Sequence, residues 1–472
     1  MNYKNYVLLL APLSALVSAD AYAYIDPASG NAIASFFIAL FGSVLFFMKS
    51  LFYRVFSRSP AVVKADTGTG GEQCTPLLFS EGKTYWTTFR PIVEELIRQK
   101  IHFRYISLDV HDPGLMIDSE YMLAKRFTKN RLGFAKFSNL VSPVMLSTTP
   151  NIGAEGYPIA RPIGVKSLVH VFHAMVDISC YRKGSLDYYD AVLMAGAHEE
   201  VSIRLVEKAR GVQPKELVVV GLPCLDDLNR QKEESGFVEK TADSSRITVL
   251  IAPSWGAKGC FSEYGTGFVK TLSAAGYSVI IRPHPHSHIF EPESVERWRT
   301  ETKNLDNVTW DTNTFGAPAM GQADILISDA SSIRFDFAFL YKKPVISLSI
   351  SRQSLSVFEG DYMPETWADT IAGEIGQVVN ADQLQSLDQL VEEAITRYTS
   401  EKLVELRDKY VANFGASASV IVPYLEQKAS FLSMTLQQQS MQQQLDALKG
   451  EMKDLRKQLA PNEPASTKAL SG

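Results

Sequence analysis

Cysteine is scarce in this chain of 472 residues, and what the sequence lacks narrows the range of functions. The four cysteines, Cys74, Cys180, Cys224 and Cys260, form no C-x-x-C pair, so neither a zinc knuckle nor a redox dithiol is indicated. There is also no excess of basic residues, because the formal net charge is −5, and nucleic-acid-binding chains usually carry a strong basic excess. A hydrophobic fraction of 46% and a charged fraction of 21% are ordinary for a folded globular protein.

Two apolar runs open the chain. The first, Tyr6 to Ala19, follows Lys4 and ends near an A-x-A sequence at residues 21–23, which is the layout of a secretory signal peptide. The second, Asn31 to Met48, carries no charge and as a helix would be about 27 Å long, close to the thickness of a bilayer core. We therefore expect residues 1–23 to be a signal peptide or a first membrane helix and residues 31–50 to be a transmembrane helix. A buried core helix is the alternative for the second run.

The charges beside the second run predict its orientation. Four basic residues follow it, whereas the connector between the two runs holds Asp20 and Asp26 and no lysine or arginine. By the positive-inside rule, everything after residue 49 is expected on the cytosolic side of the cytoplasmic (inner) membrane. This expectation holds whether the first run is cleaved or retained.

The remainder of the chain predicts an α/β fold with two similar domains. Residues 57–74 are rich in Gly, Ser, Thr and Pro and are interpreted as a linker. Short apolar strands then alternate with amphipathic helices over 75–228, and the alternation restarts over 246–430 after a polar, charged stretch. Such alternation predicts two Rossmann-like domains, each with a parallel sheet, facing across a cleft in which a ligand binds outside the carboxyl ends of the strands.

A regular 3-4 spacing of apolar residues marks the C-terminal tail. It includes Met434, Met441, Leu445, Leu448, Met452, Leu455 and Leu459, with Gln438 as the polar exception. Residues 434–459 are therefore predicted to form a coiled coil through which the chain forms a homo-oligomer. A single helix that packs back on the body is the alternative. Residues 460–472 are expected to be disordered.

A motif rich in proline and histidine, Arg282-Pro283-His284-Pro285-His286, lies at the carboxyl end of the apolar strand predicted over 277–281. The two prolines restrict the backbone around His284. An arginine can hold a phosphate by a bidentate fork, and a histidine can donate a hydrogen bond or carry a proton. The alternative is a rigid turn with a surface histidine and a structural arginine.

A second motif, Ser328-Asp329-Ala330-Ser331-Ser332, joins the apolar strand predicted over 325–327 to a helix predicted over 332–341. The free N–H groups and the positive dipole end of a helix attract phosphate, and the serines add hydroxyls. We therefore expect a phosphate site that is built without a glycine-rich loop. N-capping by Asp329 or Ser331 is the alternative, but it accounts for one polar residue better than for four in five positions.

In the first domain, His173 ends the apolar strand predicted over 167–172, so we expect it to face the second domain. A histidine in that place can deprotonate a hydroxyl near neutral pH. His170 lies three residues earlier, on the opposite face of the strand, so the two are not expected to share a metal. A structural histidine is the alternative.

Taken in order, these motifs resemble the CDP-glycerol glycerophosphotransferase family of teichoic-acid-type polymer enzymes, over about residues 75–430. The family's R-x-H-P corresponds to 282–285, and its S-D-x-S-S followed by F-D corresponds to 328–332 with Phe335 and Asp336. Its G-x-P-x-x-D is similar to 221–226, and its A-P-T-W to 252–255, where Ser254 replaces the threonine.

The resemblance implies a GT-B fold with the nucleotide and its pyrophosphate held by the second domain. It implies in-line attack on the β-phosphorus of a CDP-activated donor, with CMP leaving, so that a glycerol-phosphate or similar polyol-phosphate group passes to a hydroxyl of a polymeric or lipid-linked acceptor. His173 and His284 would be catalytic, toward the acceptor and the donor phosphates. The donor-binding residues would be Arg282, Ser328, Asp329, Ser331, Ser332 and Asp336. Neither a metal nor a separate cofactor is demanded by these residues.

One stretch departs from the family pattern. Where the family usually has W-H-G-T-P-L-K, this chain has Phe172-His173-Ala174-Met175-Val176-Asp177-Ile178. The threonine, proline and lysine are missing and Asp177 adds a negative charge, so the acceptor and the transferred group stay open. Two further interpretations remain, a GT-B glycosyltransferase that uses a sugar nucleotide and a non-catalytic scaffold tethered to the membrane.

Overall fold

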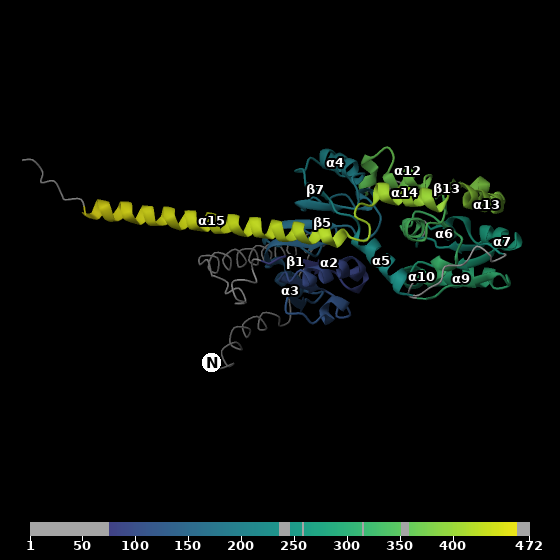
Figure 1. Cartoon of the computed structure of the whole chain (residues 1–472), viewed down its shortest axis with the longest axis horizontal. Coiled ribbons are helices and arrows are strands. Elements are labelled where there is room, and N and C mark those ends of the chain that lie inside the picture. Colours follow the sequence, from purple (N-terminus) through teal and green to yellow (C-terminus); the bar gives the residue numbers. More distant parts are fainter. Residues whose placement is uncertain (1–74, 236–245, 257–258, 314–315, 351–357, 460–472) are drawn as a thin grey trace, which may run out of the picture. The chain divides into compact units, whose positions relative to one another are not determined.

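The computed structural model describes residues 75–235, 246–256, 259–313, 316–350 and 358–459, all within a compact unit that spans Thr69–Gly472 (Figure 1). The expected membrane segments, the linker and the C-terminal tail after residue 459 lie outside these ranges. None of the helices in the described ranges has the length and apolar character to cross a membrane.

The first of two sheets has seven parallel strands in the order β3-β2-β1-β4-β5-β6-β7. The strands are β1 (Leu77–Ser80), β2 (Phe103–Ser107), β3 (Met122–Arg126), β4 (Val141–Ser147), β5 (Gly164–Val171), β6 (Ala191–Met194) and β7 (Glu216–Val219). Central strands such as β1 are buried along their whole length, as expected where helices cover both faces of a parallel sheet. The strand order reverses between β1 and β4, which is where doubly wound sheets bind ligands.

The second sheet repeats this topology with six parallel strands in the order β10-β9-β8-β11-β12-β13. The strands are β8 (Thr248–Ile251), β9 (Ser278–Ile281), β10 (Val308–Trp310), β11 (Ile325–Ser328), β12 (Val345–Leu348) and β13 (Gly376–Val379). The reversal falls between β8 and β11. The prediction of two parallel Rossmann-like sheets is therefore confirmed.

Helices cover the faces of both sheets (Figure 1). In the first half they are α2 (Trp86–Arg98), α3 (Arg131–Ser138), α4 (Glu199–Arg210) and α5 (Pro223–Glu234), with the 3-10 turns η3 (Lys83–Tyr85), η4 (Pro113–Met116) and η5 (Ile178–Cys180). The apolar residues of α2 show why it forms, since Phe89, Ile92, Val93 and Leu96 recur at helical spacing and are all buried.

The second half has shorter helices around its sheet. They are α6 (Cys260–Tyr264), α7 (Gly267–Ala274), α8 (Ser287–Phe290), α9 (Pro292–Thr302), α10 (Ala317–Gln322), α11 (Ile333–Asp336), the π-helical turn η6 (Phe337–Tyr341), α12 (Trp367–Ala372), α13 (Leu387–Arg397) and α14 (Ser400–Tyr410), with the 3-10 turns η7 (Glu359–Tyr362) and η8 (Ala381–Ser386). The helix predicted over 332–341 is thus α11 followed without a break by η6.

The last helix, α15 (Ser417–Leu459), belongs to the first half of the fold for its opening turns. Ile421, Val422, Leu425 and Ala429 are buried in one apolar cluster with Leu78 and Phe89 of the first sheet and α2. Residues 417–430, which we expected to close the second domain, therefore pack on the first. Beyond them the apolar residues are exposed, among them Phe431, Met434, Met441, Leu445, Leu448, Met452 and Leu455.

Residues 221–226, the G-x-P-x-x-D stretch, follow the last strand of the first sheet and open α5. Gly221 has φ of 98°, and a Cβ there would lie 2.3 Å from the carbonyl oxygen of Ala412, so a side chain cannot be accommodated. Pro223 begins α5. The Asp226 carboxylate accepts hydrogen bonds from the backbone N–H of Gly415 (2.6 Å) and of Ser417 (2.9 Å). The outgoing and returning chain segments are thereby fastened together.

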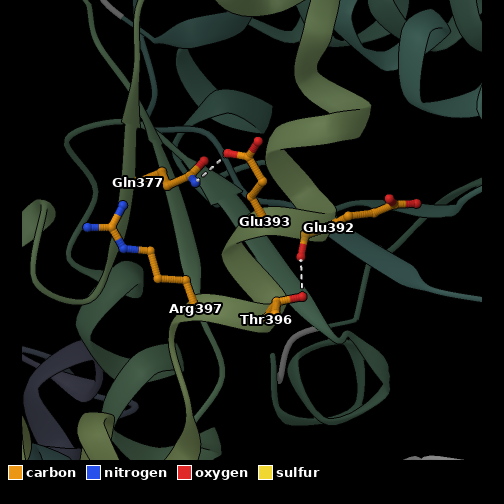
Figure 2. A pocket seen from close by; sticks show the side chains of 5 residues that line it. All are labelled: Gln377, Glu392, Glu393, Thr396 and Arg397. Atoms are coloured by element: carbon orange, nitrogen blue, oxygen red, sulfur yellow. Dashed lines mark hydrogen bonds between the residues drawn. The ribbon is translucent and has the colours of Figure 1, made fainter.

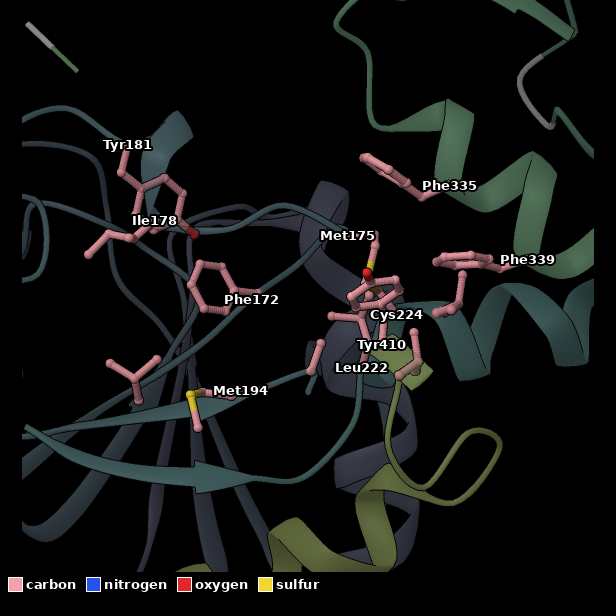
Figure 3. Packing of buried hydrophobic residues seen from close by; sticks show 14 of the residues in the cluster. Phe172, Met175, Ile178, Tyr181, Met194, Leu222, Cys224, Phe335, Phe339 and Tyr410 are labelled. Carbon is pink, nitrogen blue, oxygen red and sulfur yellow. The ribbon is translucent and has the colours of Figure 1, made fainter. Parts of the chain in front are cut away.

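A shared apolar cluster fills part of the space between the two sheets. Figure 3 shows Phe335 and Phe339, from α11 and η6, directed toward Met175 and Cys224 of the first half and Tyr410 of α14. The front of α11 is thus packed next to the first half of the fold. This places the second motif on the side of the second sheet that faces the first.

Candidate active site

Ser328 and Asp329 tie together the carboxyl ends of β8 and β11, at the reversal point of the second sheet. The Ser328 hydroxyl donates to the carbonyl of Ala252 (2.5 Å), and the Asp329 carboxylate accepts from the N–H groups of Ser254 (2.9 Å) and Cys260 (2.7 Å). Both side chains are buried. Their contacts favour a role in shaping the loop after β8 rather than in touching a ligand.

Ser331 and Ser332 follow directly and differ in character. Both are only partly buried, and neither hydroxyl makes a hydrogen bond with any residue that the structure describes. Ser332 stands at the N-cap of α11, yet its side chain does not cap the helix. The N-capping alternative therefore does not explain these serines, and their hydroxyls can serve a bound group.

His284 lies beyond the end of β9 in a defined tautomeric state. Its Nδ1 accepts a hydrogen bond from the N–H of His286 (3.1 Å), so in the neutral ring the proton is on Nε2. Burial lowers the pKa of His284 and so does His286, whereas Asp329 and Glu291 act against this. A neutral imidazole with Nε2–H is a hydrogen-bond donor suited to a phosphate oxygen.

An aromatic wall flanks His284. Trp255 stacks on Phe290 with 5.3 Å between ring centroids and lies 5.1 Å from the His286 ring and 6.4 Å from the His284 ring. Trp255 is 44% exposed and Phe290 is 64% exposed. In the sequence, Trp255 stands out only as part of the A-P-S-W stretch, and its place beside His284 is visible only in the structure.

Arg282 is engaged within the protein. Its guanidinium forms an ion pair with Asp311 (2.5 Å) and donates to the carbonyl of Asn313 (2.9 Å). Both members of the pair are largely buried. These contacts join the end of β9 to the segment after β10, so they favour a supporting role for Arg282 behind His284.

Arg334, in the first turn of α11, is the cation that sequence reasoning passed over. Its Nε donates to the carbonyl of Ser331 (3.1 Å) and its Nη1 to the hydroxyl of Ser347 (3.0 Å). The residue is 6% exposed. Burial lowers its pKa, and the carboxylates of Asp329 and Asp369 oppose this from a distance.

Asp336, at the end of α11 and shortly after the second motif, has a carboxyl whose pKa is raised. It keeps some accessible surface, yet the surrounding protein raises its pKa to about 7 through burial. It makes no hydrogen bond with a residue that the structure describes. Its charge acts on the thiol of Cys224, which indicates that it lies toward the first half of the fold.

His173 follows β5 on the first sheet. Its ring packs edge-on against Tyr85, with 5.0 Å between centroids. Burial lowers its pKa to about 4, so the ring is neutral near pH 7 and can accept a proton, as a weaker base than an ordinary imidazole. Within the described ranges its Nδ1 is buried without a hydrogen-bond partner, and no hydrogen bond or ring contact joins it to the second half.

His170 has a structural environment. It is fully buried, and its Nε2 lies 2.9 Å from the Tyr181 hydroxyl. In the part of the chain that the structure describes, no group of three or more His, Cys, Asp or Glu side chains is placed to hold a metal ion.

Asp177, which the sequence placed close to His173, is turned into the protein. Its carboxylate accepts hydrogen bonds from the N–H of Ser179 (3.1 Å) and the hydroxyl of Ser202 (3.0 Å). It is fully buried and caps η5. Its negative charge is thus stabilised by hydrogen bonds inside the protein.

A different polar pair lies near Tyr85. The Tyr157 hydroxyl donates to Glu81 (2.9 Å), and burial together with the Glu81 charge raises the pKa of Tyr85.

A surface pocket of about 400 Å³ lies elsewhere, on β13 and α13 (Figure 2). It is lined by Gln377, Glu392, Glu393, Thr396 and Arg397. Its two glutamates would repel a phosphate, and none of the candidate residues takes part in it. The pocket is therefore not the phosphate site.

Two parallel Rossmann-like sheets and this set of residues define a GT-B-like transferase. The chain belongs to the CDP-glycerol:poly(glycerophosphate) glycerophosphotransferase family, whose model matches residues 179–418. The predicted family and the prediction of a transferase are thus confirmed. A search of curated proteins gave no match.

Several solved structures are similar to this chain, and the first of them supports the fold. The wall teichoic acid polymerase TagF is 12% identical with a TM-score of 0.50, over 83% of this chain and 98% of that one. A TagF histidine variant with CDPG is 13% identical with a TM-score of 0.48 over the same shares. MurG of Acinetobacter baumannii is 11% identical with a TM-score of 0.42, over 75% of this chain and 99% of that one. At such low identity these similarities concern the fold alone.

Proposed function

We propose that this protein is a membrane-anchored transferase that moves a glycerol-phosphate or similar polyol-phosphate group from a CDP-activated donor to a hydroxyl of a cell-surface polymer or glycolipid precursor. Family membership supports the donor and the type of reaction. The observation that carries the proposal is the pair of hydroxyls on Ser331 and Ser332, which have no partner among the described residues. They lie at the reversal point of the second sheet, where such folds bind nucleotides.

On the donor side, the proposed roles follow from the contacts of each residue. Ser331 and Ser332 donate to the diphosphate, and His284 donates from Nε2 to a phosphate oxygen. Ser328, Asp329 and Arg282 hold the surrounding loops in place, and Asp336 borders the site. The aromatic wall of Trp255 and Phe290 offers a flat, exposed surface on which a nucleobase can stack. Positioning and electrostatics then supply most of the rate, as is usual in phosphoryl transfer.

On the acceptor side, His173 accepts the proton of the attacking hydroxyl. The oxygen bonds to the β-phosphorus, the bond from that phosphorus to the bridging oxygen breaks, and CMP leaves with the electron pair. A ring that is neutral near pH 7 can accept this proton without first losing one. Because the Asp177 charge is internal, it does not oppose an anionic or polyhydroxylated acceptor.

The location and assembly of the protein are part of the same proposal. The apolar run at 31–50 and the basic residues after it support a location of the transferase at the cytosolic face of the inner membrane. The apolar seam predicted over 434–459, whose residues from Met434 to Leu455 are exposed, pairs with that of a second copy. An acceptor held at the membrane surface would then meet two active sites.

The proposal is tested with the full-length protein and a series of donors. CDP-glycerol or CDP-ribitol should raise the melting temperature, because a ligand bound to the native state stabilises it. His284→Ala should lower CMP release by about 10²-fold or more, as losing a donor to transition-state charge does. His288→Ala, an exposed neighbour on α8, should not. His173→Ala should lose transfer but keep the stabilisation by CDP-glycerol.

Other outcomes would contradict the proposal. Stabilisation by a sugar nucleotide and not by CDP compounds would identify a glycosyltransferase. If no nucleotide stabilises the protein and His284→Ala has no effect, the scaffold interpretation takes its place.

A further inference from the structure

Arg334 is buried and differs from three partly buried arginines in having no anionic partner at close range. Arg90 pairs with Asp227 at 2.5 Å, Arg210 with Asp187 at 2.5 Å and Arg282 with Asp311 at 2.5 Å. Arg334 is 6% exposed, yet no carboxylate of the described residues lies within ion-pair distance. A guanidinium stays charged under all ordinary conditions, and a buried charge without a counter-ion is destabilising.

The contacts of Arg334 fix its guanidinium between the ends of two strands. Ser347, which accepts from Nη1, stands in β12 directly opposite Ser328 of β11. Nε is held by the carbonyl of Ser331, whose hydroxyl has no partner among the described residues. The second terminal nitrogen, Nη2, makes no hydrogen bond with any residue that the structure describes. A rigidly held guanidinium therefore has donor capacity left at the same strand ends as Ser328 and Ser331.

The positive charge of Arg334 also lies close enough to the first half of the fold to act on Cys180. The surrounding protein raises the pKa of the Cys180 thiol, Asp177 adds to the rise, and the Arg334 charge opposes it. Cys180 closes η5 of the first half, and the residue is exposed. The Arg334 charge is thus felt on both sides of the region where donor and acceptor would meet.

We propose that Arg334 is a substrate-binding residue that takes the diphosphate of the donor as its missing counter-ion. This inference rests on the proposed function and adds to it the cation that neutralises the phosphates. The donors that remain, on Nη2 and the second hydrogen of Nη1, lie in one plane. Such a pair suits two oxygens of one phosphate ligand. Arg282 does not fill this role, because Asp311 already neutralises it.

The alternative is that Arg334 only braces β11 against β12 through Ser331 and Ser347. The two interpretations differ in what they predict for ligands. A brace affects the stability of the fold and all ligands alike. A diphosphate-binding residue affects ligands in proportion to the phosphate groups that they carry.

The test measures the affinity of the full-length protein for CMP, CDP and inorganic pyrophosphate by titration calorimetry. Arg334→Gln should lower the affinity for CDP and for pyrophosphate by at least about tenfold, the usual effect of losing a charge-assisted hydrogen bond. The affinity for CMP should fall much less, so the ratio of CDP affinity to CMP affinity becomes smaller. Arg334→Lys, which keeps the charge and loses the fork, should be intermediate. Arg297→Gln, an exposed arginine on α9, is the matched control and should change none of the three affinities.

The other outcomes distinguish a failure of the proposed role of Arg334 from a failure of the proposed function. An unchanged ratio of CDP to CMP affinity in Arg334→Lys overturns the role of Arg334, and this variant carries the test if Arg334→Gln does not fold. If the wild type binds pyrophosphate but no cytidine nucleotide, and Arg334→Gln abolishes that binding, the proposed role of Arg334 is supported. The proposal of a CDP-activated donor is then wrong. If the wild type binds none of the three, both proposals fall.

Discussion

Replacing Asp336 by asparagine should stabilise the protein above neutral pH. The carboxyl is held where burial raises its pKa from 3.8 to about 7. Such a rise corresponds to at most about 4 kcal/mol of unfavourable free energy for the ionised form. Because the side chain keeps some accessible surface, solvent screening reduces this to about 2 kcal/mol. Asparagine has nearly the same shape and carries no charge at any pH.

The sign of the effect follows from proton linkage at Asp336. Above pH 3.8 the carboxyl ionises in the unfolded chain while it stays protonated in the folded protein, so the wild type loses stability until the pH passes about 7. The asparagine variant has no such loss. The two proteins should therefore differ least at pH 4, and the variant should be more stable by about 2 kcal/mol at pH 8.

Urea denaturation of both full-length proteins at pH 4, 6 and 8 measures this difference. Asp306→Asn, at an exposed aspartate before β10, is the control and should show a small difference that does not vary with pH. A difference for Asp336→Asn that is equal at pH 4 and pH 8 would refute the reasoning. If the stabilised variant also binds CDP less well, the carboxyl is retained for function at the expense of stability.

The remaining predictions concern the chain crossing and the tail. Gly221→Ala should lower the free energy of unfolding by about 2 kcal/mol or more, because a positive φ and a close carbonyl both oppose a Cβ. The measurement is again urea denaturation. Gly211→Ala, where φ is also positive but no atom lies within 4 Å of the added Cβ, should cost only about 1 kcal/mol. Leu448→Glu should lower the oligomer mass seen by light scattering, whereas Gln444→Glu, off the seam, should not. An equal loss of mass in both variants would argue against the coiled coil.

The sequence predicted most strands because central parallel strands are short, apolar runs. The apolar run Ala191 to Met194, for example, predicts a strand with the same limits that β6 has. The edge strands β3 and β13 were not predicted. Each is paired on one side only, and their polar residues, such as Lys125 and Arg126, face outward, so neither has a continuous apolar run.

The candidate site was predictable as a motif but not in its internal division of roles. Spacing alone could not distinguish Ser328 and Asp329, which hold backbone groups, from Ser331 and Ser332, whose hydroxyls have no described partner. Nor could it reveal that Asp311 occupies Arg282 and leaves Arg334 as the buried cation. Such distinctions depend on contacts between residues far apart in the chain, for which a single sequence gives no signal.

The fastening at Asp226 has a mechanical consequence. The carboxylate of Asp226, at the start of α5, holds the chain at residues 415–417, where it returns from the second half and enters α15. Both ends of this link belong to the first half, since α5 is joined to α2 by the Arg90–Asp227 ion pair. Since the opening turns of α15 are packed on the first half, the long helix and anything attached to it would move together with the half that carries His173.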